Sequence, residues 1–283
     1  MTNNHHTEMA TGSLSAAASD EQTPQTPQAS PTLQPLLPAE PLSATINEHT
    51  DTDTAIPAAP IAEIHTDLPL AQQQILAATY AFVKQELGGE TSGHDWWHIH
   101  RVVQMARRLA LAEGADDYIC SMAALLHDIA DEKLNPSKEV GMQRVADWLE
   151  RQKVELEERA HITFIIANMS YNGGNNPPLP SIEGKVVQDA DRLDAIGAIA
   201  IARTFVYAGH VGDMMYDPDL PVRQQMTAAE YRTGRSTAIN HFHEKLLKLK
   251  HRLNTQSARQ IAEDRHRYME EYVQRFYQEW EGR

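Results

Sequence analysis

Apolar side chains recur at helical spacing from residue 70 to the end of the chain. The run that opens with Leu70 and Ile75 stops at the Gly-Gly pair of residues 88 and 89. Alternation of polar and apolar residues, which would indicate half-buried strands, does not occur, so the pattern predicts an all-α fold. The expected helices cover about residues 70–87, 95–113, 116–131, 137–152, 155–171, 183–207, 230–253 and 255–281.

Several helix starts carry their own signals. Asp95 and Ser137 are typical N-cap residues, because an acidic or hydroxyl oxygen can accept a hydrogen bond from a free backbone N–H of the first turn. The stretch "NGGNNPPLP" that begins at residue 172 is a loop by composition. Residues 209–227 form a longer connection, which we expect to be a candidate lid over a site.

Residues 1–66 differ in composition from the rest of the chain. They contain no Lys, Arg or aromatic residue, but eight acidic residues and eight of the fifteen prolines. Such a segment buries too little apolar surface to offset the entropy of ordering it, so we expect a disordered acidic tail. Residues 67–283 then form a single helical domain with a net charge of about −6, which argues against a surface for duplex nucleic acid.

Cysteine usage and the first residues indicate the compartment. Cys120 is the only cysteine, which excludes an internal disulfide and fits a reducing environment. It lies in the apolar run "YICSMAALL", so we interpret it as a buried core residue. No stretch has the length of a membrane span, and the start "MTNNHHTEMATGSL" lacks the features of a signal peptide. We therefore expect a cytoplasmic protein without a membrane partner.

Four polar residues stand where helix faces should be apolar. His98 shares a face with Val102 and Leu109, His127 and Asp128 follow the apolar block "MAALL", and Asp191 lies in the most hydrophobic of the expected helices. Taken singly, a core histidine bonded to a carbonyl, or an aspartate in an ion pair, is the commoner explanation. Taken together, the four residues would be satisfied by one divalent ion, which compensates buried carboxylates.

Three motifs now point to a family. The segments "GHDWWHIHRV", "AALLHDIADEK" and "DADRLDAIGAIAIARTF" resemble the HD-domain metal-dependent phosphohydrolase superfamily, and especially its small stand-alone bacterial members that act as nucleotide pyrophosphohydrolases. The similarity covers about residues 70–280 and implies a compact HD helical bundle. It also implies the metal ligands His98, His127, Asp128 and Asp191, with Trp96 and Trp97 beside them as walls of the site.

Two imidazoles and two carboxylates suit a range of divalent ions, of which we favour Mn²⁺ over Mg²⁺, Co²⁺, Fe²⁺ and Zn²⁺. Six-coordinate geometry would leave one place for an activated water and one for a phosphoryl oxygen. By the resemblance, Asp131 is the group that activates water, with Glu132 as its substitute, because both would share a helix side with Asp128. A solvated acidic helix end is the ordinary alternative for these two residues.

Phosphate oxygens require cations, and we expect them from Arg101, Lys133, Arg192 and Lys245, although each is about as well explained as a surface ion-pair residue. Asp194 shares a face with Asp191 and could orient a ligand imidazole, or pair with Arg192 or Arg203. Dinuclear HD proteins insert two further histidines before the last aspartate. Only His161 occurs there, which favours one metal ion, although His161 could still line the pocket.

These inferences predict a metal-dependent phosphohydrolase that acts on a small phosphorylated substrate, most simply a nucleoside or deoxynucleoside triphosphate, through attack by a metal-bound water. A nucleoside monophosphate phosphatase and a noncatalytic nucleotide-sensing HD module are the alternatives, and a metal-stabilised scaffold is a third class. The aromatic residues Tyr171, Phe205 and Tyr207 could shape a base pocket. The two terminal helices offer enough amphipathic surface for a homodimer.

Overall fold

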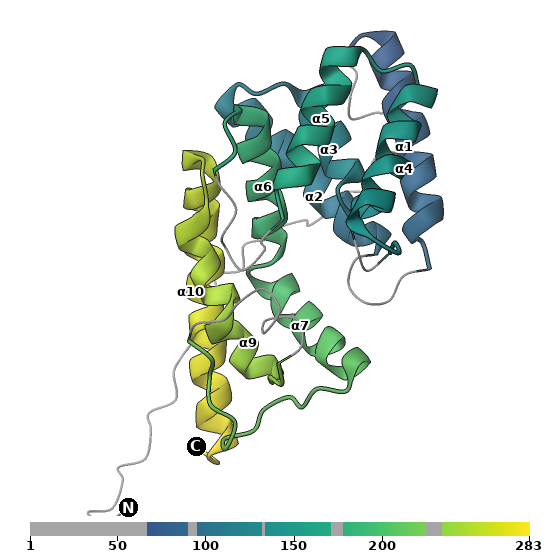
Figure 1. Ribbon diagram of the computed structural model, residues 1–283. Coiled ribbons are helices and arrows are strands. Elements are labelled where there is room, and N and C mark those ends of the chain that lie inside the picture. Colours follow the sequence, from purple (N-terminus) through teal and green to yellow (C-terminus); the bar gives the residue numbers. More distant parts are fainter. Residues whose placement is uncertain (1–66, 90–94, 132–133, 171–177, 225–233) are drawn as a thin grey trace, which may run out of the picture. The chain divides into compact units, whose positions relative to one another are not determined.

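The computed structural model describes residues 67–89, 95–131, 134–170, 178–224 and 234–283, and within these ranges every regular element is helical (Figure 1). This confirms the all-α prediction. The predicted tail and the predicted site residues Glu132, Lys133 and Tyr171 lie outside the described residues. The elements are α1 (Leu70–Leu87), α2 (Trp96–Glu113), α3 (Asp117–Leu126), the 3₁₀ helix η2 (Asp128–Ala130), α4 (Lys138–Arg151), α5 (Leu156–Asn168), α6 (Ile182–Asp194), α7 (Ala198–Val211), α9 (Ala238–Glu244), the 3₁₀ helix η4 (Leu246–Arg252) and α10 (Gln256–Trp280).

Helix α3 is the centre of the core. Every residue from Tyr118 to Leu126 is buried, and the helix packs against α1, α2, α5 and α6. Cys120 is among them, as predicted, and burial raises the pKa of its thiol. A helix buried on all sides has a fixed position, so the residues that follow its last turn are held in place as well.

The predicted caps are present. The Asp95 carboxylate accepts a hydrogen bond from the backbone N–H of His98, and the Ser137 hydroxyl accepts one from Val140. A cap of this kind stabilises a helix by about 1 kcal/mol. Asp95 therefore sets the first turn of α2 and, with it, the position of His98.

The prediction of one helix over residues 183–207 is wrong. The chain breaks between α6 and α7, where Gly197 has φ 91° and ψ −164°, a conformation that is disfavoured for any residue with a side chain. A Cβ at this position would also lie 3.0 Å from Cγ of Arg265, which belongs to α10. The apolar Ala-Ile sequence on both sides hides this break from a periodicity argument.

Two further helices end earlier than predicted. In place of the helix expected over 116–131, the α-helix α3 ends at Leu126 and the 3₁₀ turn η2 follows it. Asp131, after η2, has an extended backbone conformation. The described part of the helix expected over 230–253 consists of α9 and η4, separated at Lys245, whose φ of −135° is not helical.

Helices α7, α9 and α10 enclose an aromatic cluster of Phe205, Phe242, Tyr272 and Phe276. Phe205 packs in this cluster and contributes to the core, which differs from the predicted role as part of a base pocket. None of the described helices is long and apolar enough to cross a membrane.

The described part of the predicted lid is fastened to α9. The backbone N–H groups of Ala238 and Ile239 donate to the carbonyls of Met214 and Met215. The buried carboxylate of Glu244 accepts hydrogen bonds from the backbone and guanidinium of Arg223. These contacts argue against a loosely attached lid over residues 214–223.

Candidate metal centre

His98 lies in the first turn of α2 with its ring buried against α6. Its Nδ1 is 2.7 Å from Oδ2 of Asp194. Hydrogen bonds from His98 and Arg101 outweigh the effect of burial and lower the pKa of Asp194, so the carboxylate is ionised and accepts. The proton of a neutral His98 therefore sits on Nδ1, and Nε2 presents a lone pair.

His127 is held in the same way by a different acceptor. It follows the last residue of α3, and its Nδ1 lies 2.8 Å from the carbonyl oxygen of Ala124. A carbonyl oxygen only accepts, so Nδ1 must carry the proton, and Nε2 of the neutral ring again presents a lone pair. This Nε2 is buried and has no hydrogen-bond partner among the described residues.

Both lone pairs face carboxylate oxygens. Nε2 of His98 lies 3.5 Å from Oδ2 of Asp128 and 3.5 Å from Oδ1 of Asp191. Nε2 of His127 lies 3.2 Å from Oδ1 of Asp128 and 3.9 Å from Oδ1 of Asp191. The four residues predicted as ligands are thus brought together from α2, the α3–η2 junction and α6.

The donor set fits a cation. Ligand atoms of His98, His127 and Asp128 all lie within 4.8 Å of one another, and the three residues form a possible metal site. Lone pairs that face carboxylates repel unless a positive charge lies between them. For His127, burial lowers the pKa, but the charges of Asp128 and Asp191 outweigh it and raise the pKa. The site thus attracts positive charge, either a proton or a metal ion.

The turn that carries Asp128 is braced from α4. Gly141 lies so close to η2 that a Cβ on it would be 2.7 Å from the carbonyl oxygen of Ala130. The Asn135 side-chain amide donates to the carbonyls of Ile129 and Asp131. The sequence offers no signal for this role of Asn135.

The carboxylate of Asp194 is a shared hydrogen-bond acceptor next to the candidate metal centre. Besides His98, its carboxylate accepts hydrogen bonds from Nε of Arg101 at 2.7 Å, from a terminal nitrogen of Arg101 at 3.1 Å and from Arg203 at 2.6 Å. Of the alternatives left open by the sequence, the structure shows both the contact with a ligand imidazole and the pair with Arg203. The sequence analysis named Arg203 only as a possible ion-pair partner of Asp194.

The remaining predicted residues are placed as follows. Asp131 follows η2, where its backbone N–H donates to the carbonyl of Asp128, and its charge contributes to the raised pKa of His127. It reaches this position through a 3₁₀ turn, which corrects the expected α-helical spacing. Arg192 donates to the carbonyl of Arg252 at the end of η4. Lys245 lies at the junction of α9 and η4.

The two tryptophans have different environments. Trp96 is buried edge-on against Tyr80, with ring centroids 5.9 Å apart, and anchors the start of α2 to α1. Trp97 is 59% exposed and packs edge-on against His100, so its place as a wall of the site stays a prediction. In a helix, adjacent side chains point in directions about 100° apart, so Trp97 cannot share the buried face that Trp96 occupies.

His161 lies away from the four predicted ligands. Its Nε2 is 2.9 Å from the Ser181 hydroxyl, which caps the N-terminus of α6. Asp191 is ten residues further along α6, which corresponds to about 15 Å. His161 is therefore held at the opposite end of that helix from Asp191 and does not line the candidate metal centre, contrary to the alternative left open by the sequence.

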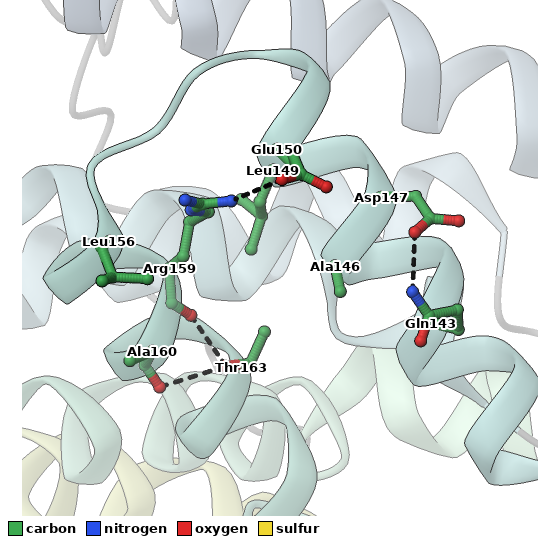
Figure 2. Close-up of a pocket in the computed structure, with 9 residues that line it drawn as sticks. All are labelled: Gln143, Ala146, Asp147, Leu149, Glu150, Leu156, Arg159, Ala160 and Thr163. Carbon is green, nitrogen blue, oxygen red and sulfur yellow. Dashed lines mark hydrogen bonds and ion pairs between the residues drawn. The ribbon is translucent and has the colours of Figure 1, made fainter.

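A small cavity of about 220 Å³ lies between α4 and α5 (Figure 2). Gln143, Leu156 and Arg159 are among its lining residues, and no predicted ligand is. Arg159 pairs with Glu150, with 3.5 Å between a guanidinium nitrogen and a carboxylate oxygen. Figure 2 draws this pair as a dashed line. The cavity is distinct from the candidate metal centre.

Comparisons with known proteins agree with this geometry. Residues 96–196, which contain all four predicted ligands, match the family model described as HD domain. The chain is 40% identical over 195 residues to the uncharacterized protein YpgQ of Bacillus subtilis (strain 168), covering 68% of this chain and 87% of that protein. The chain belongs to the HD superfamily.

Solved structures support the assignment to the HD superfamily. A crystal structure of an HD-superfamily hydrolase from Bacillus thuringiensis has 50% identity and a TM-score of 0.61, covering 75% of this chain and 100% of that one. Bacillus subtilis YpgQ in complex with ADP has 36% identity and a TM-score of 0.58, covering 72% and 97%. A Lactobacillus plantarum protein has 42% identity and a TM-score of 0.68, covering 74% and 98%. This HD protein is accordingly a metal-dependent phosphohydrolase.

Proposed function

We propose that this HD protein hydrolyses nucleoside or deoxynucleoside triphosphates and releases pyrophosphate. The observation that carries the proposal is the pair of buried imidazole lone pairs that face two carboxylates, because such a set selects a divalent cation. The nucleotide class is supported by a relative, Bacillus subtilis YpgQ, whose structure was solved in complex with ADP.

His98, His127, Asp128 and Asp191 would hold one divalent ion, for which we favour Mn²⁺. When bound, such an ion polarises a phosphoryl oxygen and lowers the pKa of water. The protein fixes both imidazoles in the tautomer that binds a cation, through Asp194 for His98 and through the Ala124 carbonyl for His127.

The remaining chemistry falls to side chains around this group. A water oxygen attacks the α-phosphorus, the bond from this phosphorus to the bridging oxygen of the leaving pyrophosphate breaks, and the water proton passes to Asp131. Asp131 fits this role because it follows the ligand Asp128 closely and acts electrostatically on His127. Arg101, Arg192 and Lys245 remain our predicted phosphate-binding residues among those described.

The test is a screen of nucleoside triphosphates, nucleoside monophosphates and phosphorylated metabolites, with Mn²⁺ added back to chelator-treated protein. We expect pyrophosphate and a nucleoside monophosphate as products. Orthophosphate released from monophosphates would establish the phosphatase alternative, and nucleotide binding without turnover would establish the sensor. Either result would refute the proposal.

A pair of histidine variants then locates the activity. His127→Ala removes a predicted ligand, and we expect turnover to be lost while the circular dichroism spectrum is retained. His161→Ala is the matched control, because it removes a partly buried histidine at the other end of α6 and should retain the rate. Equal activity in both variants would place the chemistry elsewhere.

A further inference from the structure

Helix α7 and the residues just after it expose a group of large apolar side chains. Of the fourteen such side chains that are exposed in the described part of the chain, six lie between residues 199 and 215, and each is 41–60% exposed. Single exposed apolar residues are ordinary, whereas a group within one short segment indicates an interaction surface. We call these six side chains the α7 face: Ile199, Val206, Tyr207, Val211, Met214 and Met215.

The composition of α7 makes this exposure unusual. The helix contains no acidic residue, and its only basic residues are Arg203 and His210. Arg203 donates to the carboxylate of Asp194. A helix with so little charge is normally buried on all sides, and α7 packs against α9 and α10 through Ala200, Ile201 and Ala208. Its other side has no polar covering of its own.

The α7 face continues beyond the helix on an ordered backbone. Helix α7 ends at Gly212, whose φ is 79°. The carbonyls of Met214 and Met215 then accept hydrogen bonds from the backbone N–H groups of Ala238 and Ile239. A surface whose backbone is already ordered loses less conformational entropy when it binds a partner.

We infer that the α7 face binds the α7 face of a second copy of this chain, which forms a two-fold symmetric dimer. A two-fold contact places one surface against itself, so the surface must be self-complementary. An uncharged apolar face meets this requirement, whereas charged surface in a chain with a net charge of −14 repels its own copy. Ala202 and Gly209 are exposed on the same side of α7, and their small size lets two helices approach closely.

The area of the α7 face fits a small specific interface. A large apolar side chain buries about 60–120 Å², so six half-exposed ones offer about 200–350 Å² per copy. The smallest specific interfaces bury about 600 Å² per partner, of which about 350 Å² is apolar. The α7 face therefore supplies most of the apolar area that such a dimer needs, and we expect a micromolar Kd.

Two other arrangements fit the structure less well. The sequence analysis expected a homodimer through the two terminal helices, but α10 carries exposed ion pairs, Arg267 with Asp264 and Arg275 with Glu279. A membrane surface also binds apolar helices, but helices that lie on membranes are rich in Lys and Arg. Arg203 is the only such residue in α7.

Sedimentation velocity of the full chain over about 1–100 µM brackets the expected Kd. We expect a monomer–dimer equilibrium. Val206→Glu brings like charges together at the contact and should raise the Kd at least about tenfold. Val206 is 60% exposed and Glu is a good helix former, so the circular dichroism spectrum should be retained. Met215→Glu, which lies outside the helix, should weaken the dimer in the same way.

The matched control is Leu111→Glu, the same kind of change at an 88% exposed apolar residue of α2. It should dimerise as the unmodified protein does. A chain that stays monomeric at about 100 µM overturns the inference, because a micromolar dimer would be populated there. A dimer that Val206→Glu weakens no more than Leu111→Glu does, or a monomer that sediments with phosphatidylcholine vesicles, also overturns it. These measurements need no nucleotide, so the dimer and the proposed function stand or fall separately.

Discussion

The Asp194→Asn substitution tests how the candidate metal centre is built. The amide keeps the size of the side chain but removes the charge that faces His98, Arg101 and Arg203. Removing one partner of a buried ion pair costs about 3–5 kcal/mol, and we expect the lower end of this range because the remaining guanidiniums are partly exposed. We therefore expect a loss of about 3 kcal/mol in the free energy of unfolding. With a urea dependence of about 2–3 kcal/mol per molar, the unfolding midpoint falls by about 1–1.5 M.

The same substitution should weaken metal binding. An amide can donate to Nδ1 of His98, which moves the ring proton to Nε2 and removes the lone pair from the predicted ligand atom. Loss of such an outer partner typically costs 10–100-fold in metal affinity, so we expect about that increase in the Kd for Mn²⁺. Isothermal titration calorimetry on chelator-treated protein measures it directly.

Asp117→Asn is the control for both measurements. It removes a carboxylate from a partly exposed pair with Arg107, for which about 1 kcal/mol or less is expected. Manganese binding should not change in this variant. The reasoning is refuted if Asp194→Asn binds Mn²⁺ as tightly as the unmodified protein, or loses no more stability than Asp117→Asn.

Three further predictions concern the rest of the chain. Asp131→Asn should bind Mn²⁺ normally and lose about 100-fold or more in turnover, and an unchanged rate would remove it as the proton acceptor. Gly197→Ala should lower the free energy of unfolding by about 1–3 kcal/mol, as measured in urea, because φ is 91°. For Glu244, burial raises the pKa, but hydrogen bonds from Arg223 outweigh it and lower the pKa. The ionised Glu244 therefore stabilises the fold above the pKa that it has in the unfolded chain, and this stabilisation is lost as the pH falls through its lower pKa in the folded protein. Between about pH 5 and 3, the free energy of unfolding should thus fall less in Glu244→Gln than in the unmodified protein.

Local signals account for what the sequence predicted well. Helix starts were predicted because an N-cap side chain accepts a hydrogen bond from a backbone N–H only three residues later, as Asp95 and Ser137 do. The four residues predicted as ligands were singled out because a carboxylate or imidazole on an apolar face needs compensation wherever the partner lies, and the structure brings the four together. These arguments need no knowledge of distant contacts.

Other features depend on contacts that a linear pattern does not contain. The break at Gly197 follows from the approach of Arg265, 68 positions later, and the surrounding apolar residues continue the helical period across it. Arg203 could not be assigned to Asp194 from the sequence alone because Arg192 is much nearer to Asp194 along the chain. The different environments of Trp96 and Trp97 follow from their packing, which two adjacent identical residues in a sequence do not reveal.

The break at Gly197 also joins two helices that serve one carboxylate. Helix α6, before it, carries Asp191 and Asp194, while α7, after it, carries Arg203, whose guanidinium pairs with Asp194. A substitution in α7 that leaves Arg203 in place would keep the donors of the candidate metal centre unchanged, whereas a shift of α7 as a whole would reach Asp194 through Arg203.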